Sequence, residues 1–202
     1  MAVKTIIFDL GNVLLKFDVR IIARKLAEKF SLDEDRLFDL FFDSPLTGIH
    51  DDGKISEREF HRRVMEMFNI NMAFEEFREI WVDIFTENTD VAELVQFLSK
   101  EYKVFLMTNI NKMHFDYIKG KFAIIKEFDK VFTSYEVGER KPHPKIFNAA
   151  ISYADAKPDE IVFIDDRKEL IEGAEKLGIR GIVFKDIQQL KEDLSKNGVN
   201  SV

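Results

Sequence analysis

The chain has 202 residues, of which 46% are hydrophobic and 33% are charged, a composition typical of one globular domain and not of a disordered chain. Its 37 acidic and 30 basic residues give a net charge of −7 without a basic block, which disfavours nucleic acid as a partner. The absence of cysteine excludes disulfides, thiolate metal sites and a cysteine nucleophile. No stretch approaches the roughly 20 apolar residues of a membrane span, and the start lacks a signal-peptide pattern. We therefore expect a cytoplasmic protein without a membrane partner.

Short β-branched or aromatic runs alternate with longer amphipathic segments along most of the chain. Strands that alternate with helices predict a parallel sheet with helices on both faces, the three-layer Rossmann-like α/β class. The expected strands are residues 5–9, 104–109, 130–134, 161–165 and 181–184, and the expected helices are residues 90–100, 112–122, 144–154 and 168–177.

Residues 10–103 separate the first two expected strands, far more than the dozen or so residues that a crossover needs. Within this gap, residues 17–85 show helical periodicity throughout, with aromatic residues repeated along the helix faces. We therefore predict a core of residues 1–16 and 86–202, with a small all-helical cap of residues 17–85 inserted after the first strand. The aromatic stripes are interpreted as the packed interior of this cap.

Polar side chains stand where the expected strands end. Asp9 ends the first strand, Thr108 the second and the Asp165-Asp166 pair the fourth, while Lys141 lies in a turn after the third. The carboxyl ends of parallel strands meet at one edge of a sheet, where ligands bind. There the Asp9 carboxylate could attack a phosphorus atom, with Asp9 and the acidic pair offering the oxygen ligands that Mg²⁺ prefers. Lys141 and Thr108 would hold the other phosphate oxygens.

Four short segments occur in a fixed order along the chain. They are Phe-Asp-Leu-Gly-Asn at residues 8–12, Met-Thr-Asn at 107–109, Arg-Lys-Pro at 140–142 and Phe-Ile-Asp-Asp at 163–166. This order resembles the four motifs of the haloacid dehalogenase superfamily, and the helical insertion after the first motif is similar to the cap of many members. The resemblance extends over the whole chain.

The resemblance implies a magnesium-dependent phosphatase that forms an aspartyl-phosphate on Asp9. Lys141 would neutralise the nucleophile and the phosphate, and Thr108 would bind the phosphate together with Asn109. The implied Mg²⁺ ligands are Asp9, the carbonyl of Gly11, Asp165 and Asp166.

Most phosphatases of this family carry a second aspartate two residues after the nucleophile, where this chain has Gly11. That aspartate protonates the leaving oxygen, and loss of such a group typically costs about 10² to 10⁴ in rate. The Asp-Leu-Gly-Asn sequence resembles a subgroup that includes bacterial glucose-1-phosphate phosphatases. An anomeric leaving group needs less help from an acid, so we expect the substrate to be a small phosphorylated metabolite such as a sugar phosphate.

Two alternatives stay open. Gly11 would also fit a non-catalytic pseudoenzyme that binds a phosphorylated ligand, although such a protein would keep costly buried charges without using them. A metal-independent 2-haloacid dehalogenase also uses an aspartate nucleophile on this fold, but it needs no acidic pair at Asp165 and Asp166. The sequence does not indicate an oligomeric state.

The histidines give weaker signals. His50 lies in a cap segment that could hang over the active site, so it is a candidate contact to the substrate. His61, His114 and His143 lack the spacing of a helical zinc site, and exposed polar roles are expected for them. Ser56 is expected to cap a following helix.

Overall fold

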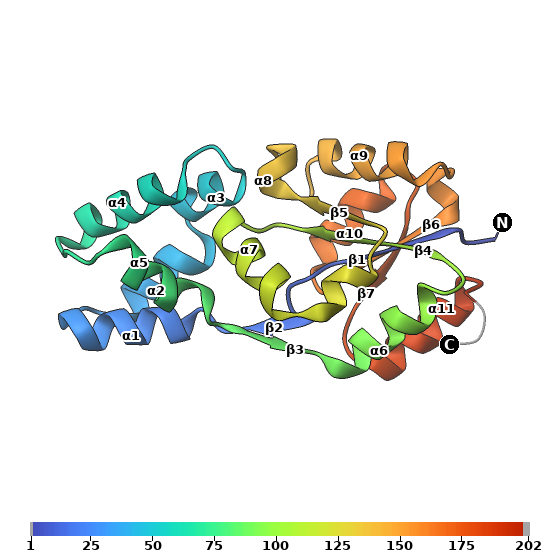
Figure 1. Ribbon diagram of the computed structural model, residues 1–202. Coiled ribbons are helices and arrows are strands. Elements are labelled where there is room, and N and C mark those ends of the chain that lie inside the picture. Colours follow the sequence, from blue (N-terminus) through green and yellow to red (C-terminus); the bar gives the residue numbers. More distant parts are fainter. Residues whose placement is uncertain (1, 200–202) are drawn as a thin grey trace.

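A five-stranded parallel sheet forms the centre of the computed structural model, which describes residues 2–199 apart from the side chain of Asp43 (Figure 1). The strands lie in the order β5-β4-β1-β6-β7, so the first strand occupies the middle. They are β1 (Thr5–Phe8), β4 (Lys103–Thr108), β5 (Lys130–Thr133), β6 (Ile161–Asp165) and β7 (Arg180–Val183). The predicted parallel sheet is confirmed.

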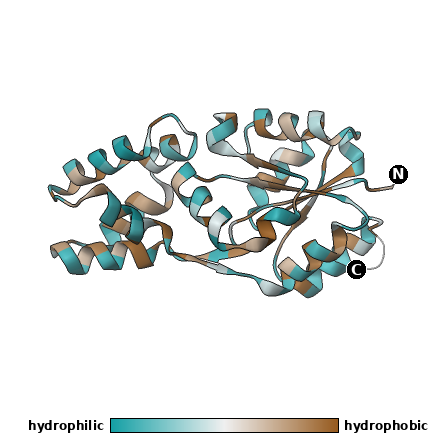
Figure 2. Cartoon of the chain, in the orientation of Figure 1, coloured by the Kyte–Doolittle hydropathy of each residue, from teal (hydrophilic) through white to brown (hydrophobic). Residues whose placement is uncertain are grey.

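Successive residues of β1 pack on opposite faces of the sheet, as the strand geometry requires. Ile6 and Phe8 belong to one hydrophobic cluster, whereas Ile7 belongs to a second. Figure 2 shows the hydrophobic strands between helices whose outer faces are hydrophilic. The first face is covered by α6 (Thr89–Leu98), α7 (Lys112–Lys121) and α11 (Ile187–Lys196), and the second by α9 (Pro144–Ala154) and α10 (Lys168–Glu175). The three-layer arrangement is therefore confirmed.

Three short helical segments complete the core. They are α8 (Ser134–Val137), η1 (Ala123–Glu127) and η2 (Pro158–Glu160). Of these, α8 directly follows β5 and faces the inserted helices, which makes it part of the boundary between core and cap.

The insertion after β1 is a bundle of helices held together by aromatic side chains. Phe60, Phe77 and Trp81 are buried at its centre, and the ring of Phe60 lies 4.9 Å from that of Trp81. The Ser56 hydroxyl accepts a hydrogen bond from the backbone N–H of Glu59 at 3.2 Å, so the predicted helix cap is present. The helices are α1 (Arg20–Phe30), α2 (Glu34–Asp43), α3 (Pro45–Asp51), α4 (Glu57–Phe68) and α5 (Phe74–Val82).

A two-stranded antiparallel ribbon, which the sequence analysis did not predict, connects this bundle to the core. It consists of β2 (Leu15–Phe17) and β3 (Phe85–Glu87). The chain therefore leaves the core and returns to it along neighbouring strands, visible below the centre of Figure 1. Each strand has three residues, too short for an alternating pattern to be recognised.

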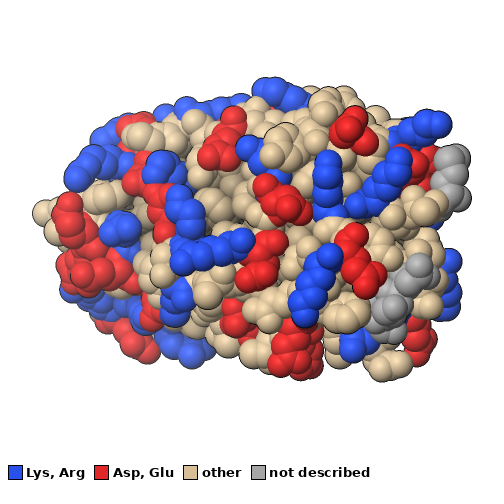
Figure 3. All heavy atoms as spheres, turned by 45° about the vertical axis from the view of Figure 1, so that its right-hand side comes forward, with Lys and Arg blue, Asp and Glu red and all other residues tan. Residues whose placement is uncertain are grey.

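Acidic and basic side chains are interspersed over the face of the molecule shown in Figure 3. This distribution fits the scattered charges of the sequence. Among the described residues, no helix is both long enough and apolar enough to cross a membrane.

Candidate active site

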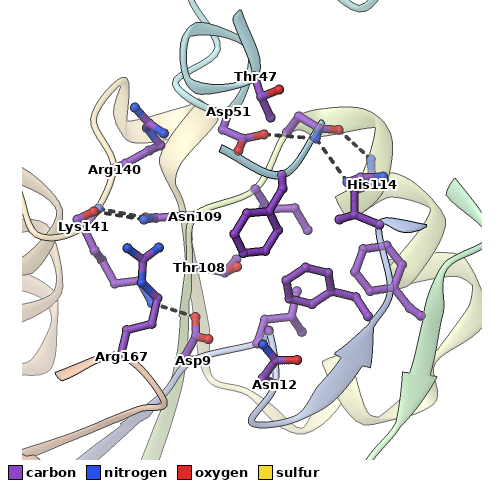
Figure 4. Close-up of a pocket in the computed structure, with 18 of the residues that line it drawn as sticks. Asp9, Asn12, Thr47, Asp51, Thr108, Asn109, His114, Arg140, Lys141 and Arg167 are labelled. Atoms are coloured by element: carbon purple, nitrogen blue, oxygen red, sulfur yellow. Dashed lines mark hydrogen bonds and ion pairs between the residues drawn. The ribbon is translucent and has the colours of Figure 1, made fainter. Parts of the chain in front are cut away.

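A cavity of about 470 Å³ lies at the carboxyl ends of the core strands, between the core and the inserted helices (Figure 4). Its core side carries the candidate residues that come from separate parts of the sequence. Asp9, Gly11, Thr108, Asn109, Lys141, Asp165 and Asp166 all line this cavity. The structure thus brings the four motifs together in one place.

Lys141 is the centre of the charged cluster, with only 4% of its surface exposed. Its ammonium group donates to Asp9 Oδ1 at 2.6 Å, to Asp165 Oδ2 at 2.6 Å and to the Met107 carbonyl at 3.0 Å. These three acceptors match the three hydrogens of an ammonium group. Burial by itself would lower the pKa of Lys141, but the two carboxylates raise it above its ordinary value. Lys141 therefore stays positively charged and holds both carboxylates in place.

Two carboxyl groups of the cluster, those of Asp9 and Asp166, have a raised pKa. Burial raises the pKa of Asp9 to about 7, and the charge of Asp165 adds to this effect, while Lys141 opposes it. Burial also raises the pKa of half-buried Asp166, although Asn12 donates a hydrogen bond to it at 3.2 Å. A further cation would favour the ionised form of both groups.

The three carboxyl groups are arranged in a way that suits a hard divalent cation. One oxygen each from Asp9, Asp165 and Asp166 lies within 4.8 Å of the others. Mg²⁺ prefers carboxylate, carbonyl and water oxygens, and it needs only one or two carboxylates besides waters and phosphate. The oxygen donors of this cluster therefore fit such an ion.

Asn109 interacts with the backbone of Lys141. Its Nδ2 donates to the Lys141 carbonyl at 2.9 Å, and its Oδ1 accepts from the Lys141 N–H at 2.7 Å. This two-point contact fixes the loop that carries Lys141. Thr108, directly before Asn109, is buried at the end of β4 and lines the cavity.

Gly11 and the ring of Phe17 lie against each other. A Cβ atom built on Gly11 would be 3.0 Å from Cε1 of Phe17, closer than most such contacts, and 3.8 Å from Oδ2 of Asp9. The aromatic ring therefore borders the space into which a longer side chain at this position would extend.

The position of His50 corrects one prediction. His50 is 2% exposed, its ring stacks on Phe60 at 4.2 Å, and it is not among the residues that line the cavity. Its burial in an aromatic environment lowers its pKa to about 3. His50 is therefore a neutral packing residue of the cap, and we do not retain it as a substrate contact.

His114 also differs from the prediction, because it is buried rather than exposed. Its Nε2 lies 2.8 Å from the carbonyl of Trp81, and its ring stacks on the Trp81 ring at 4.9 Å. Burial lowers the pKa of His114 to about 4. The pattern of apolar residues in this segment does not show that a cap helix packs over His114.

Several polar residues of the cavity escaped the sequence analysis, among them Asp51 and Arg140. Asp51, at the end of α3, faces the cavity from the cap, and Asn111 Nδ2 donates to its Oδ1 at 3.0 Å. Arg140 also lines the cavity, and its Nε donates to Oδ1 of Asp52 at 2.9 Å. Arg140 could have been found from its place beside Lys141 in the third motif, whereas nothing in the sequence marks Asp51.

Comparison with known proteins places this geometry in a family. The profile of the haloacid dehalogenase-like hydrolases matches residues 3–178. The chain belongs to this family. Among characterised relatives, D-ribitol-5-phosphate phosphatase of Bacteroides thetaiotaomicron is 27% identical over 185 residues, which cover 87% of this chain and 89% of that protein.

Solved structures support the same assignment. The HAD family enzyme bt-2542 of Bacteroides thetaiotaomicron, in complex with magnesium and inorganic phosphate, has a TM-score of 0.82 at 25% identity, covering 91% of this chain and 95% of its own. L-2-haloacid dehalogenase of Xanthobacter autotrophicus has a TM-score of 0.67 at 15% identity, covering 98% of this chain and 85% of its own. The second likeness concerns the fold alone.

Proposed function

We propose that this hydrolase removes the phosphate group from a small phosphorylated polyol or sugar, using Mg²⁺ and the carboxylate of Asp9. The observation that carries the proposal is the buried cluster in which Lys141 joins Asp9 to Asp165 while Asp166 lies close by. The comparisons with other proteins also support the proposal, since one relative is named for D-ribitol 5-phosphate and one similar structure contains magnesium and inorganic phosphate.

The residues that would hold the metal are Asp9, Asp165 and Asp166, with the Gly11 carbonyl as a further candidate. A magnesium ion bound there would neutralise the charge of the phosphate as it meets these carboxylates. Lys141 and the metal together would favour the ionised form of Asp9, and Thr108 would offer its hydroxyl to a phosphate oxygen. Asn109 would act by fixing the backbone of Lys141.

The reaction would proceed in two displacements. First, an oxygen of Asp9 forms a bond to phosphorus while the ester P–O bond breaks, and the leaving alcohol takes a proton. Then water attacks the phosphorus of the aspartyl-phosphate, which releases inorganic phosphate and restores the carboxylate. Because Gly11 carries no acid, the proton for the leaving oxygen would come from another donor, namely solvent, the substrate itself or a replacement group of the protein.

The size and lining of the cavity support a small substrate. A volume of about 470 Å³ suits a compact metabolite. The walls include Phe17, Phe41, Trp81 and Phe85, against which the C–H groups of a polyol or sugar can pack. The glucose-1-phosphate hypothesis remains within this class, whereas the relative named for D-ribitol 5-phosphate favours a phosphate on a primary alcohol.

Phosphate release tests the proposal. The substrates are D-ribitol 5-phosphate, glucose 1-phosphate, glucose 6-phosphate and 4-nitrophenyl phosphate, each with Mg²⁺ or with EDTA. We expect release only with Mg²⁺, and we expect Asp9→Asn to lower kcat about a thousand-fold or more, as loss of a nucleophile does elsewhere. Asp39→Asn, an exposed carboxylate on α2, is the matched control and should keep full activity.

Other outcomes would point to the alternatives. Full activity of the Asp9→Asn variant would contradict the role of Asp9. Binding of inorganic phosphate in calorimetry without any hydrolysis would favour the pseudoenzyme. Chloride release from 2-chloropropionate in EDTA would favour a dehalogenase.

A further inference from the structure

Phe42 is an exposed aromatic residue on the wall of the active-site cavity. It belongs to α2 of the cap, and 58% of its surface is exposed. Three other large hydrophobic residues of the described chain are also exposed, but Met67, Phe97 and Tyr153 do not line the cavity. The exposed surface of Phe42 therefore lies where a substrate can cover it, and the hydrophobic effect would favour that contact.

The preceding residue explains why Phe42 reaches the cavity. Phe41 is buried, and its ring contacts the ring of Trp81 edge to face, with 5.1 Å between the two centroids. Successive residues of an α-helix point about 100° apart, so a helix that buries Phe41 in the cap turns Phe42 away from the cap interior. Phe41 therefore fixes α2 to the cap, while Phe42 stays accessible at the cavity wall.

Neighbouring side chains support the ring of Phe42. Phe38, one turn earlier on α2, stacks on it with the ring centroids 5.2 Å apart and an interplanar angle of 14°. The guanidinium carbon of Arg20 lies 4.2 Å from the centre of the Phe38 ring, and Nη1 of Arg20 lies 3.1 Å from Oδ1 of Asp35. A cation above an aromatic ring is attracted to it. Contacts from α1 and α2 thus hold Phe38, and Phe38 in turn supports Phe42 as a flat surface.

Charge does not decide which group the cavity accepts beyond the phosphate. Asp51, Arg140 and Arg167 line the cavity outside the charged cluster of Lys141, so both signs of charge are present there. Each of these three side chains also has a partner within the protein. The aromatic part of the wall, in contrast, favours a group that presents an apolar face.

We propose that Phe42 determines substrate preference by stacking on the ring of a cyclic sugar phosphate, so that the enzyme prefers a sugar ring to an open-chain polyol. This inference rests on the proposed function and narrows its substrate class. A pyranose ring in the chair form has a face of C–H groups that lies flat on an aromatic ring, where many atoms make van der Waals contact at once. An open chain has no such face, and it loses more rotational freedom when it is held in place.

A matched pair of substrates tests the inference. Glucose 6-phosphate is mainly a pyranose, and glucitol 6-phosphate is an open chain with the same number of carbons; both carry the phosphate on a primary alcohol. Because the leaving groups match, a difference in kcat/KM reports how the rest of the molecule binds. We expect the wild type to prefer glucose 6-phosphate, and Phe42→Leu to reduce this preference about three- to ten-fold, as loss of an aromatic contact does. The change should be in KM rather than kcat, because the ring contact is made equally before and during the reaction.

Phe42→Tyr and Phe97→Leu are the controls. The tyrosine variant keeps a flat aromatic ring and should keep the preference for glucose 6-phosphate. Phe97→Leu changes an exposed phenylalanine of α6 outside the cavity, and it should leave the preference within about 1.5-fold of wild type, a margin below the smallest effect expected at Phe42. The preference is a ratio of two substrates in one sample, so partial unfolding of a variant does not change it.

The inference is overturned if the wild type cleaves glucitol 6-phosphate as well as glucose 6-phosphate or better, if Phe42→Leu keeps the wild-type preference, or if Phe42→Tyr loses it. Cleavage of D-ribitol 5-phosphate or 4-nitrophenyl phosphate without either hexose derivative would also overturn it, while the proposed function would stand. Failure to cleave any of the four esters would instead refute the proposed function, and the inference with it.

Discussion

The aromatic ring of Phe17 lies against Gly11 in the active site, on the side where a side chain at position 11 would begin. A Cβ at Gly11 would approach the ring to 3.0 Å, so an acid cannot be restored there without moving Phe17. A carboxylate introduced there by a single substitution would therefore press against this ring. The absence of an acid at Gly11 and the presence of the ring are consistent with each other at this position.

We expect Gly11→Asp alone to give no gain in kcat. In a Phe17→Ala background, the same change should raise kcat on D-ribitol 5-phosphate about ten-fold or more over Phe17→Ala alone, because a positioned acid typically contributes about 10² to 10⁴. The gain should be smaller on 4-nitrophenyl phosphate, whose leaving group needs little protonation. Equal gains on both substrates, or a gain from Gly11→Asp alone, would contradict this account.

Individual residues were predictable where the fold leaves one choice. Asp9 and Thr108 lie at or just after strand ends, and a parallel sheet brings those positions to one edge whatever the rest of the chain does. His50 and Asp51 are neighbours on one helix and so point about 100° apart. Which of the two faces the cavity depends on how α3 docks, and the sequence alone does not determine that.

At the scale of elements, α3 of the cap and α8 of the core are in close contact. Gly53 follows α3 with a φ of +69°, and a Cβ there would lie 2.5 Å from the carbonyl oxygen of Tyr135 in α8. Only a residue without a side chain lets the two backbones approach this closely. The glycine is thus a condition for the contact of α3 with α8 in the arrangement in which Asp51 faces the cavity.

Gly53→Ala should therefore lower the free energy of unfolding by more than the cost of placing an alanine in a left-handed backbone conformation. Gly198→Ala is the matched control, because Gly198 has a φ of +85° and a Cβ added there would meet no atom within 4 Å. We expect about 1 kcal/mol for the control from the left-handed conformation. Gly53→Ala should cost about 1 to 3 kcal/mol more from the clash. Urea unfolding measures both, and equal costs would show that the approach of α8 is unimportant.

The five strands of the core sheet and the helices α6, α7, α9 and α10 were predicted within one or two residues at their ends, because the period and the length of each pattern agree. The helix α11 was not predicted. The ribbon of β2 and β3 was missed, and so was α8, since three or four residues cannot display a period. The cap was recognised as helical, but its docking on α7 and α8 was not. Those contacts join helices that lie far apart in the sequence, and neither the apolar period nor the length of a helix shows which other helix it packs against.

At the scale of the whole molecule, two buried histidines make the stability depend on pH. Burial lowers the pKa of His114 from 6.5 to about 4 and that of His50 to about 3. The unfolded chain therefore binds more protons than the folded protein in the range below 6.5. The contribution of these two histidines to the free energy of unfolding is fully present above about pH 6.5, and it is lost progressively as the pH falls toward 4.

His114→Gln should flatten this dependence. Each pKa unit corresponds to about 1.4 kcal/mol, so His114 accounts for about 3 kcal/mol between the two limits. The free energy of unfolding is measured in urea at about pH 7.5, above this titration range, and at about pH 4.5, near its lower end. The variant should lose less stability between them than the wild type, although it is less stable at both. His143→Gln removes an exposed histidine as a control, and a wild-type slope in the His114 variant would contradict the assignment.

The pairing of Leu15 with Glu87 and of Phe17 with Phe85 has an evolutionary consequence. Because the chain departs and returns at adjacent points, recombination between related genes can replace everything between β2 and β3 without interrupting a core strand. The exchange carries one constraint, since Asn111 and His114 in the core are fitted to Asp51 and to Trp81. A new cap would bring a new substrate preference, and the start of α7 would have to be inherited with it.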